Sequence, residues 1–127
     1  MTRPTPKLLV VDDDALNRDL MVRRLAKRGF DASDAESGEK ALERVRAGAT
    51  DLVLLDVEMP GMSGLEVLAQ LRKAYSPAQL PVIMVTGKAG SDDVVQALEA
   101  GANDYVTKPI DFPVALARIQ TQLSRKM

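Results

Sequence analysis

Four apolar runs of this sequence each end in a side chain that can do chemistry. The first run is followed by Asp12 and Asp13, the second by Asp56, the third by Thr86 and the fourth by Lys108. If the runs are parallel strands of one open sheet, their carboxyl ends share the edge at which such sheets bind ligands. The pattern therefore predicts that carboxylates, a hydroxyl and an ammonium converge there, which is the outline of a site for phosphoryl chemistry.

The residue types at this edge favour a hard metal ion. The chain has no Cys and no His, so thiol chemistry, imidazole catalysis and the usual zinc sites are excluded. Three gathered carboxylates repel one another and call for a cation or a buried proton. Magnesium takes oxygen ligands and keeps several waters, so we expect Asp13 and Asp56 to bind it directly and Asp12 to hold one of its waters. Manganese would suit the same ligands.

Apolar runs alternate with segments of helical period along the chain. Five of each predict an α/β protein, a doubly wound parallel sheet with helices on both faces. The predicted strands are Lys7–Val11, Phe30–Ala35, Asp51–Asp56, Pro81–Val85 and Asp104–Thr107. The predicted helices begin at Ala15, behind Ser37, Ser63 and Ser91, and at Asp111, and the first four end near Arg28, Gly48, Tyr75 and Gly101.

Helical spacing also predicts which side chains face the sheet. The expected buried positions are Leu16, Leu20, Met21 and Leu25; Ala41, Leu42 and Val45; Leu65, Leu68 and Leu71; Val94 and Leu98; and Phe112, Leu116, Ile119 and Leu123. Asp14 is expected to cap the first helix, and Ser63 with Glu66 has the spacing of a capping box. Asn17 and Arg18 are interpreted as ordinary polar surface.

Length, charge and hydropathy narrow the class of protein. With 127 residues the chain is expected to form one domain, residues 1–127, with a core of about 7–123. No run approaches the roughly 20 apolar residues that span a bilayer, and the first six residues lack the apolar segment of a signal peptide, so we expect a cytoplasmic protein that does not bind membranes. The net charge of −1 argues against direct nucleic-acid binding.

Taken in order, these residues resemble the receiver domain of two-component response regulators, the CheY-like family, from Lys7 to about Leu123. The matching residues are Asp12, Asp13, Asp56, Met59-Pro60-Gly61, Gly64, Thr86, Gly87, Gly101-Ala102, Tyr105 and Lys108-Pro109. Each match is weak alone, but the ordered set is specific. The resemblance implies a flavodoxin-like (βα)5 fold with strand order 2-1-3-4-5.

The resemblance also implies a phosphorylation-dependent signalling switch, which catalyses only its own aspartyl phosphorylation and dephosphorylation. Asp56 would accept the phosphoryl group while Thr86 and Lys108 neutralise its oxygens. The main-chain carbonyl of Glu58 would join the metal ligands. Tyr105 would act as a rotamer switch, and a cis bond to Pro109 would aim the lysine inward.

The implied partners are a phosphodonor and an output protein. The donor would be the phosphohistidine of a histidine kinase or of a histidine phosphotransfer protein. The fourth helix, last strand and fifth helix would present the output surface to an output domain or a downstream protein.

Glu58 and Lys88 are expected to flank the water that hydrolyses the aspartyl phosphate. A stand-alone receiver and a piece cut from a longer regulator or hybrid kinase both stay open.

Two other function classes fit parts of the sequence. Asp12 and Asp14 after an apolar strand have the spacing of haloacid dehalogenase-type phosphohydrolases, in which Asp12 would be the nucleophile and Asp14 the acid. The chain is short for that class, and Asp56 would have no role in it. The other alternative is a receiver that binds proteins without being phosphorylated, which the complete chemical set does not favour.

Overall fold

The computed structural model of the protein describes residues 5–87 and 92–126. In these residues, five parallel strands form one sheet in the order β2-β1-β3-β4-β5, which confirms the predicted fold class and strand order. The strands are β1 (Lys7–Val11), β2 (Asp31–Ala35), β3 (Leu52–Asp56), β4 (Val82–Thr86) and β5 (Asp104–Thr107). The helices are α1 (Ala15–Lys27), α2 (Gly38–Arg46), α3 (Gly64–Ala74), α4 (Asp92–Glu99) and α5 (Phe112–Lys126).

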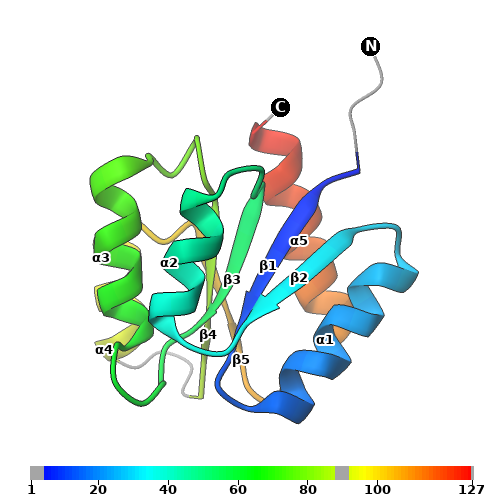
Figure 1. Ribbon diagram of the computed structural model, residues 1–127, viewed down its shortest axis with the longest axis horizontal. Helices are drawn as coiled ribbons and strands as arrows, with labels where there is room; N and C mark the ends of the chain where they lie inside the picture. The colour runs from blue at the N-terminus through cyan, green and yellow to red at the C-terminus, as the bar shows by residue number, and fades with distance from the viewer. Residues whose placement is uncertain (1–4, 88–91, 127) are drawn as a thin grey trace.

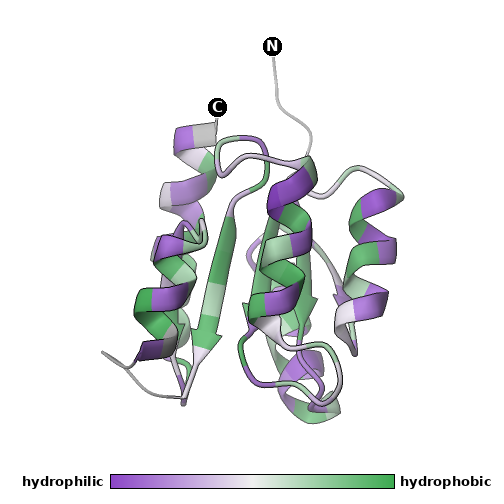
Figure 2. Ribbon diagram, turned by 90° about the vertical axis from the view of Figure 1, so that its left-hand side faces the viewer, coloured by the Kyte–Doolittle hydropathy of each residue, from purple (hydrophilic) through white to green (hydrophobic). Residues whose placement is uncertain are grey.

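The sheet lies between two layers of helices. Figure 1 shows α1 and α5 on one face and α2, α3 and α4 on the other. Both faces of the central strands are therefore buried, which explains why β3 and β4 are buried at every position and read as continuous apolar runs. In Figure 2 the central strands are mostly hydrophobic, whereas the helices carry bands of both colours.

Alternate side chains of each strand enter different cores. In the described part of the chain, one buried cluster joins Val11, Leu55 and Met84 to α2, α3 and α4. The other joins the intervening strand residues, such as Val10 and Leu54, to α1 and α5. The ends of the strands are thus held by packing on both faces of the sheet. Among the described helices, none is both long and apolar enough to cross a membrane.

Several local predictions are confirmed. The Asp14 side chain caps α1 by accepting hydrogen bonds from the backbone of Leu16 and Asn17. Ser63 and Glu66 form the expected capping box at the start of α3. Ala41, Leu42 and Val45 are buried, as are Leu68 and Leu71, while Leu65 is half-buried. The expected stripe of α5 is buried at all four positions: Phe112, Leu116, Ile119 and Leu123.

The prediction that Leu16 and Leu20 are buried is wrong, because they are 67% and 47% exposed. α1 buries Met21 and Leu25 instead, as was also expected. At roughly 100° per residue, a helix that buries Met21 and Leu25 turns Leu16 and Leu20 to its other side. α1 therefore presents two leucines to solvent beside the carboxyl edge of the sheet.

The prediction for Leu98 on α4 is also wrong. Val94 is buried as expected, but Ala97 is the second buried residue of the helix and Leu98 is 44% exposed. The buried face is centred between Val94 and Ala97, so Leu98 lies toward solvent together with Val95. Ser91, which was expected to cap this helix, lies outside the described residues.

Candidate functional site

The register of the strands brings the predicted site residues to one edge. Asp56, the last residue of β3, pairs with Val85 of β4, so it lies next to Thr86. Thr86 in turn pairs with Thr107 of β5, the residue that precedes Lys108. The parallel sheet therefore gathers chemistry that is spread over most of the chain, as the sequence predicted.

Three carboxylates meet at this edge. Asp12, Asp13 and Asp56 can each offer an oxygen, and these atoms all lie within 4.8 Å of one another. Asp12 and Asp56 are buried, whereas Asp13 is exposed. An all-oxygen donor set of this size, open to solvent on one side, fits a hard divalent cation that keeps some of its waters.

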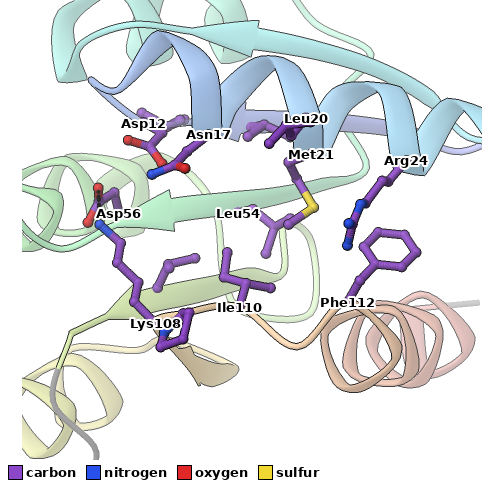
Figure 3. Close-up of a pocket in the computed structure, with 14 residues that line it drawn as sticks. Asp12, Asn17, Leu20, Met21, Arg24, Leu54, Asp56, Lys108, Ile110 and Phe112 are labelled. Atoms are coloured by element: carbon purple, nitrogen blue, oxygen red, sulfur yellow. Dashed lines mark hydrogen bonds and ion pairs between the residues drawn. The ribbon is translucent and has the colours of Figure 1, made fainter.

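Lys108 already pairs with one of these acids. Its Nζ donates a hydrogen bond to Asp56 Oδ2 at 2.8 Å, and Figure 3 shows the lysine pointing at the carboxylate. Burial alone would lower the pKa of Lys108, but its hydrogen bond to Asp56 and the negative charges of Asp56, Asp12 and Asp13 outweigh burial and raise that pKa. The ammonium is therefore firmly charged. The peptide bond between Lys108 and Pro109 is cis, as the resemblance implied.

Asp12 is the acid most affected by its surroundings. Burial, followed by the charge of Asp56, raises the pKa of Asp12 above its ordinary value, although a hydrogen bond from the backbone of Asp14 opposes the shift. In the absence of a cation this carboxyl therefore resists ionisation. A divalent cation placed among the three acids would remove that resistance.

Thr86 and Tyr105 lie on the paired strands β4 and β5. Thr86 is buried at the end of β4, and its carbonyl accepts a hydrogen bond from the backbone of Lys108 at 2.8 Å. Tyr105 is half-buried and packs against the core cluster on the α4 side of the sheet. The guanidinium of Arg118 lies 5.9 Å from the centre of the Tyr105 ring and is paired with both carboxylate oxygens of Asp104.

The turn after β3 fixes the orientation of Asp56. The backbone of Glu58 donates to Asp56 Oδ1 at 3.1 Å, and the Glu58 side chain is exposed. α3 begins so close to the strand that any side chain at Gly64 would collide with the main-chain carbonyl of Asp56. Lys88, the expected partner of Glu58, lies outside the described residues.

A cavity extends from the acids between α1 and the segment that leads into α5. Its volume is about 320 Å3, and Figure 3 shows Asp12, Asp56 and Lys108 at one end. Its walls are mainly apolar and include Leu20 and Ile110. Leu20, one of the two exposed leucines of α1, thus borders an apolar hollow that opens at the site.

Arg18 is a site residue that the sequence reasoning missed, because it was interpreted as polar surface. Its side chain is only 16% exposed. Nη1 donates to the main-chain carbonyl of Asp12 at 2.8 Å, and Nε donates to Asp34 Oδ2 at 3.1 Å. The signal was present in the spacing, since Arg18 lies three residues before the buried Met21 and therefore on the same face of α1.

Comparisons with known proteins agree with this geometry. The family model of the response regulator receiver domain matches residues 8–120. The crystal structure of a CheY-like response regulator receiver domain protein from Methanospirillum hungatei JF-1 is 30% identical, with a TM-score of 0.90 and 97% of both chains covered.

Two similar structures belong to longer proteins. A two-component system response regulator/GGDEF domain protein is 28% identical with a TM-score of 0.90, and the match covers 94% of this chain but 49% of that one. NtrX from Brucella abortus is 30% identical with a TM-score of 0.88, and the match covers 97% of this chain and 28% of that one.

Proteins of this family are generally signalling switches controlled by phosphorylation, and they typically bind magnesium. The match spans most of the chain, and the fold is that of the family. This chain belongs to the response regulator receiver domain family.

Proposed function

We propose that Asp56 accepts a phosphoryl group from the phosphohistidine of a histidine kinase or of a histidine phosphotransfer protein. The observation that carries this assignment is the position of Asp56. It is buried at the end of the central strand, has the Lys108 ammonium at 2.8 Å, and lies within reach of Asp12 and Asp13. Of the acids in the cluster, it is the one that the lysine holds.

The transfer needs no general base, because an ionised carboxylate is already a nucleophile. A carboxylate oxygen of Asp56 forms the new bond to phosphorus as the phosphorus–nitrogen bond of the donor breaks, and the electron pair of that bond returns to the imidazole. Lys108 and the Thr86 hydroxyl neutralise the phosphoryl oxygens during transfer. The existing pair between Lys108 and Asp56 places the ammonium beside the reacting carboxylate.

Magnesium is the proposed cofactor, and manganese would bind the same donors. Asp13 and Asp56 would bind the ion directly, Asp12 would hold one of its waters, and the main-chain carbonyl of Glu58 would complete the protein ligands. When bound, the ion offsets the charge of the carboxylates and of the incoming phosphoryl group. Support comes from the oxygen-only donor set and from the pKa of Asp12, which burial raises and which the negative charges of Asp56 and Asp13 raise further.

The donor protein is proposed to dock on α1. Leu16 and Leu20 are exposed on α1, and Leu20 lines the apolar cavity that leads to Asp56, so an apolar surface of the donor can cover them while its phosphohistidine reaches the site. This assignment gives the two leucines a reason to face solvent.

The output surface is proposed to be α4, β5 and α5. Val95 and Leu98 on α4 and Val114 on α5 are exposed apolar side chains there. Movement of Thr86 toward the phosphoryl group would let Tyr105 turn inward and change that surface, on which an output domain or a downstream protein would bind. Neither direct nucleic-acid binding nor membrane binding is part of the proposal, and the cytoplasmic location stays a prediction.

Intact-mass measurement tests the assignment of Asp56. Wild type and Asp56→Asn are incubated with acetyl phosphate and magnesium, and we expect a gain of one phosphoryl group in wild type and none in the variant. Asp51→Asn, which changes an acid at the opposite edge of the sheet, is the matched control and should gain the group. An equal gain in Asp56→Asn would refute the assignment, and a phosphoryl group mapped to Asp12 would favour the phosphohydrolase alternative.

A further inference from the structure

Arg18 ties α1 to the ends of two strands with a single guanidinium. Its Nη1 donates to the main-chain carbonyl of Asp12, just beyond β1, at 2.8 Å. Its Nε donates to the carboxylate of Asp34, in β2, at 3.1 Å. The Arg18 side chain is mostly buried, whereas that of Asp34 is 44% exposed. A planar fork that makes two directed bonds holds position better than a flexible ammonium does.

The bond to Asp12 bears directly on the acid cluster. The backbone N–H of Asp12 donates to Ala35, and its Oδ1 accepts from the backbone of Asp14 at 2.9 Å, so its main chain and side chain are both held. The carbonyl that Arg18 holds belongs to the peptide unit that links Asp12 to Asp13. Because that unit is planar, fixing its oxygen also fixes the direction in which Asp13 leaves the strand.

Arg18 acts on the cluster in two opposite ways. Its positive charge lies close to the acids and therefore opposes the binding of a metal cation. The negative charge of Asp34 partly cancels this effect. Its hydrogen bonds orient the acids and so favour binding of that cation. Charge and geometry therefore predict opposite changes in magnesium affinity when Arg18 is removed.

We propose that Arg18 is a positioning residue for the metal site and that Asp34 is its anchor. The proposal rests on the magnesium binding described under the proposed function, and it assigns roles to two residues that touch neither the metal nor the phosphoryl group. Residues that orient metal ligands typically change metal affinity about 10–100-fold when they are replaced.

The test compares magnesium affinity in four variants of the full chain. Arg18→Met keeps most of the aliphatic stem but removes the charge and both donors, and Arg18→Lys keeps the charge but cannot make both bonds. Asp34→Asn weakens the anchor. The matched control is Arg23→Met, because Arg23 is an exposed arginine of the same helix that pairs with Asp19.

Magnesium dissociation constants come from titrations followed by nuclear magnetic resonance, and each variant is melted in the presence of a chelator to measure its fold stability separately. We expect Arg18→Met to bind magnesium about 10-fold or more weakly, Arg18→Lys to recover only part of the loss, and Asp34→Asn to lose about threefold. Arg23→Met should stay close to wild type.

Three outcomes would overturn the proposal. Magnesium affinity of Arg18→Met equal to that of wild type would show that Arg18 does not position the metal site, and higher affinity would show that its charge outweighs its hydrogen bonds. Wild-type affinity in Arg18→Lys would show that two directed bonds are not needed. If Arg18→Met does not melt cooperatively, the test depends on Asp34→Asn. Unchanged magnesium affinity in Asp34→Asn would then reject the role of Asp34 as the anchor of Arg18. A wild type that binds no magnesium would remove the metal from the proposed function itself, which is a distinguishable result.

Discussion

The two edges of the sheet both carry buried polar groups, but they balance them differently. At the carboxyl edge, three acids crowd together and one ammonium pairs with one of them. At the amino edge, the guanidinium of Arg72 on α3 donates four hydrogen bonds, all to neutral oxygens: the main-chain carbonyls of Gly101, Tyr75 and Leu80, and the side-chain oxygen of Asn103.

Asn103 extends the network at the amino edge. Its side-chain oxygen also accepts from the backbone of Val82, and its amide nitrogen donates to Pro77 and to the buried Gln122 of α5. Arg72 and Asn103 therefore link α3, the loop before β4, the turn before β5 and α5. Burial lowers the pKa of Arg72, but a guanidinium stays charged in proteins.

This difference in charge balance distinguishes the candidate binding site at the carboxyl edge from the structural network at the amino edge. Around Arg72, four oxygen atoms of the protein accept hydrogen bonds from the guanidinium, so most of its donors are satisfied within the fold. Around Asp12 the negative charge exceeds the positive charge, so a cation would improve the energy of the folded state. Four predictions test this distinction, in order of decreasing effect.

Asp13→Ala should abolish magnesium binding at ordinary magnesium levels and abolish phosphorylation with it, because a direct carboxylate ligand is lost. The melting temperature without metal should not fall, since the change also relieves repulsion. Magnesium titration and intact mass measure the first two effects. Asp31→Ala, at the amino edge of the sheet, is the control, and an unchanged titration of Asp13→Ala would contradict the assignment.

Arg72→Ala should lower the free energy of unfolding by about 3 kcal/mol, because several acceptors lose their donor. In a domain of this size that corresponds to a fall of roughly 10 °C in melting temperature. Magnesium affinity of the folded protein should not change. Arg44→Ala, an exposed arginine of α2, is the control. A large loss of magnesium affinity in Arg72→Ala would break the distinction between the two edges.

Asp12→Asn should stabilise the metal-free domain at pH 7 by about 1 kcal/mol, the order of one repulsion between two carboxylates about 4 Å apart in bulk water. The folded-state pKa of Asp12 is raised, so its stabilising contribution is complete below the ordinary value of 3.8 and is lost as pH rises through the higher folded value. The melting temperature in the presence of a chelator, measured at pH values from below 3.8 up to 7, tests this effect. A variant that is less stable than wild type at pH 7 would contradict it.

Thr86→Ala should permit phosphorylation but weaken the response of α4, β5 and α5. Loss of one hydroxyl hydrogen bond, about 1 kcal/mol, shifts a two-state equilibrium about fivefold. Amide chemical shifts before and after phosphorylation measure the response. Thr121→Ala, an exposed threonine of α5, is the control, and a full-sized response in Thr86→Ala would show that Thr86 does not couple the site to that surface.

The sequence was most informative about side chains whose position depends on strand order alone. Asp12, Asp56, Thr86 and Lys108 follow apolar runs, and a parallel sheet brings such positions together whatever the details of packing. Helix faces were harder to predict, because Leu16 and Leu20 have the same spacing as the buried pair Met21 and Leu25. Only the contacts of α1 with the sheet decide between the two pairs.

Long-range polar contacts could not be predicted at all. Arg18 finds Asp34 across 16 residues, and Arg72 finds Asn103 across 31. The spacing from Met21 places Arg18 on the buried face of α1, but nothing in the local sequence of either arginine identifies its partner. Such contacts depend on where turns place individual carbonyls, which neither periodicity nor motif spacing encodes.

The contact between Gly64 and Asp56 affects how the tolerance of this chain to substitution should be interpreted. Any side chain at Gly64 strikes the main chain of the residue that we assign as phosphoacceptor, and neither α3 nor β3 can move away without disturbing the core. A complete scan of single substitutions should therefore score Gly64 as strictly as Asp56, although Gly64 has no side chain to offer a phosphoryl group. Intolerance to mutation at this turn reports the closeness of two backbones as well as chemistry.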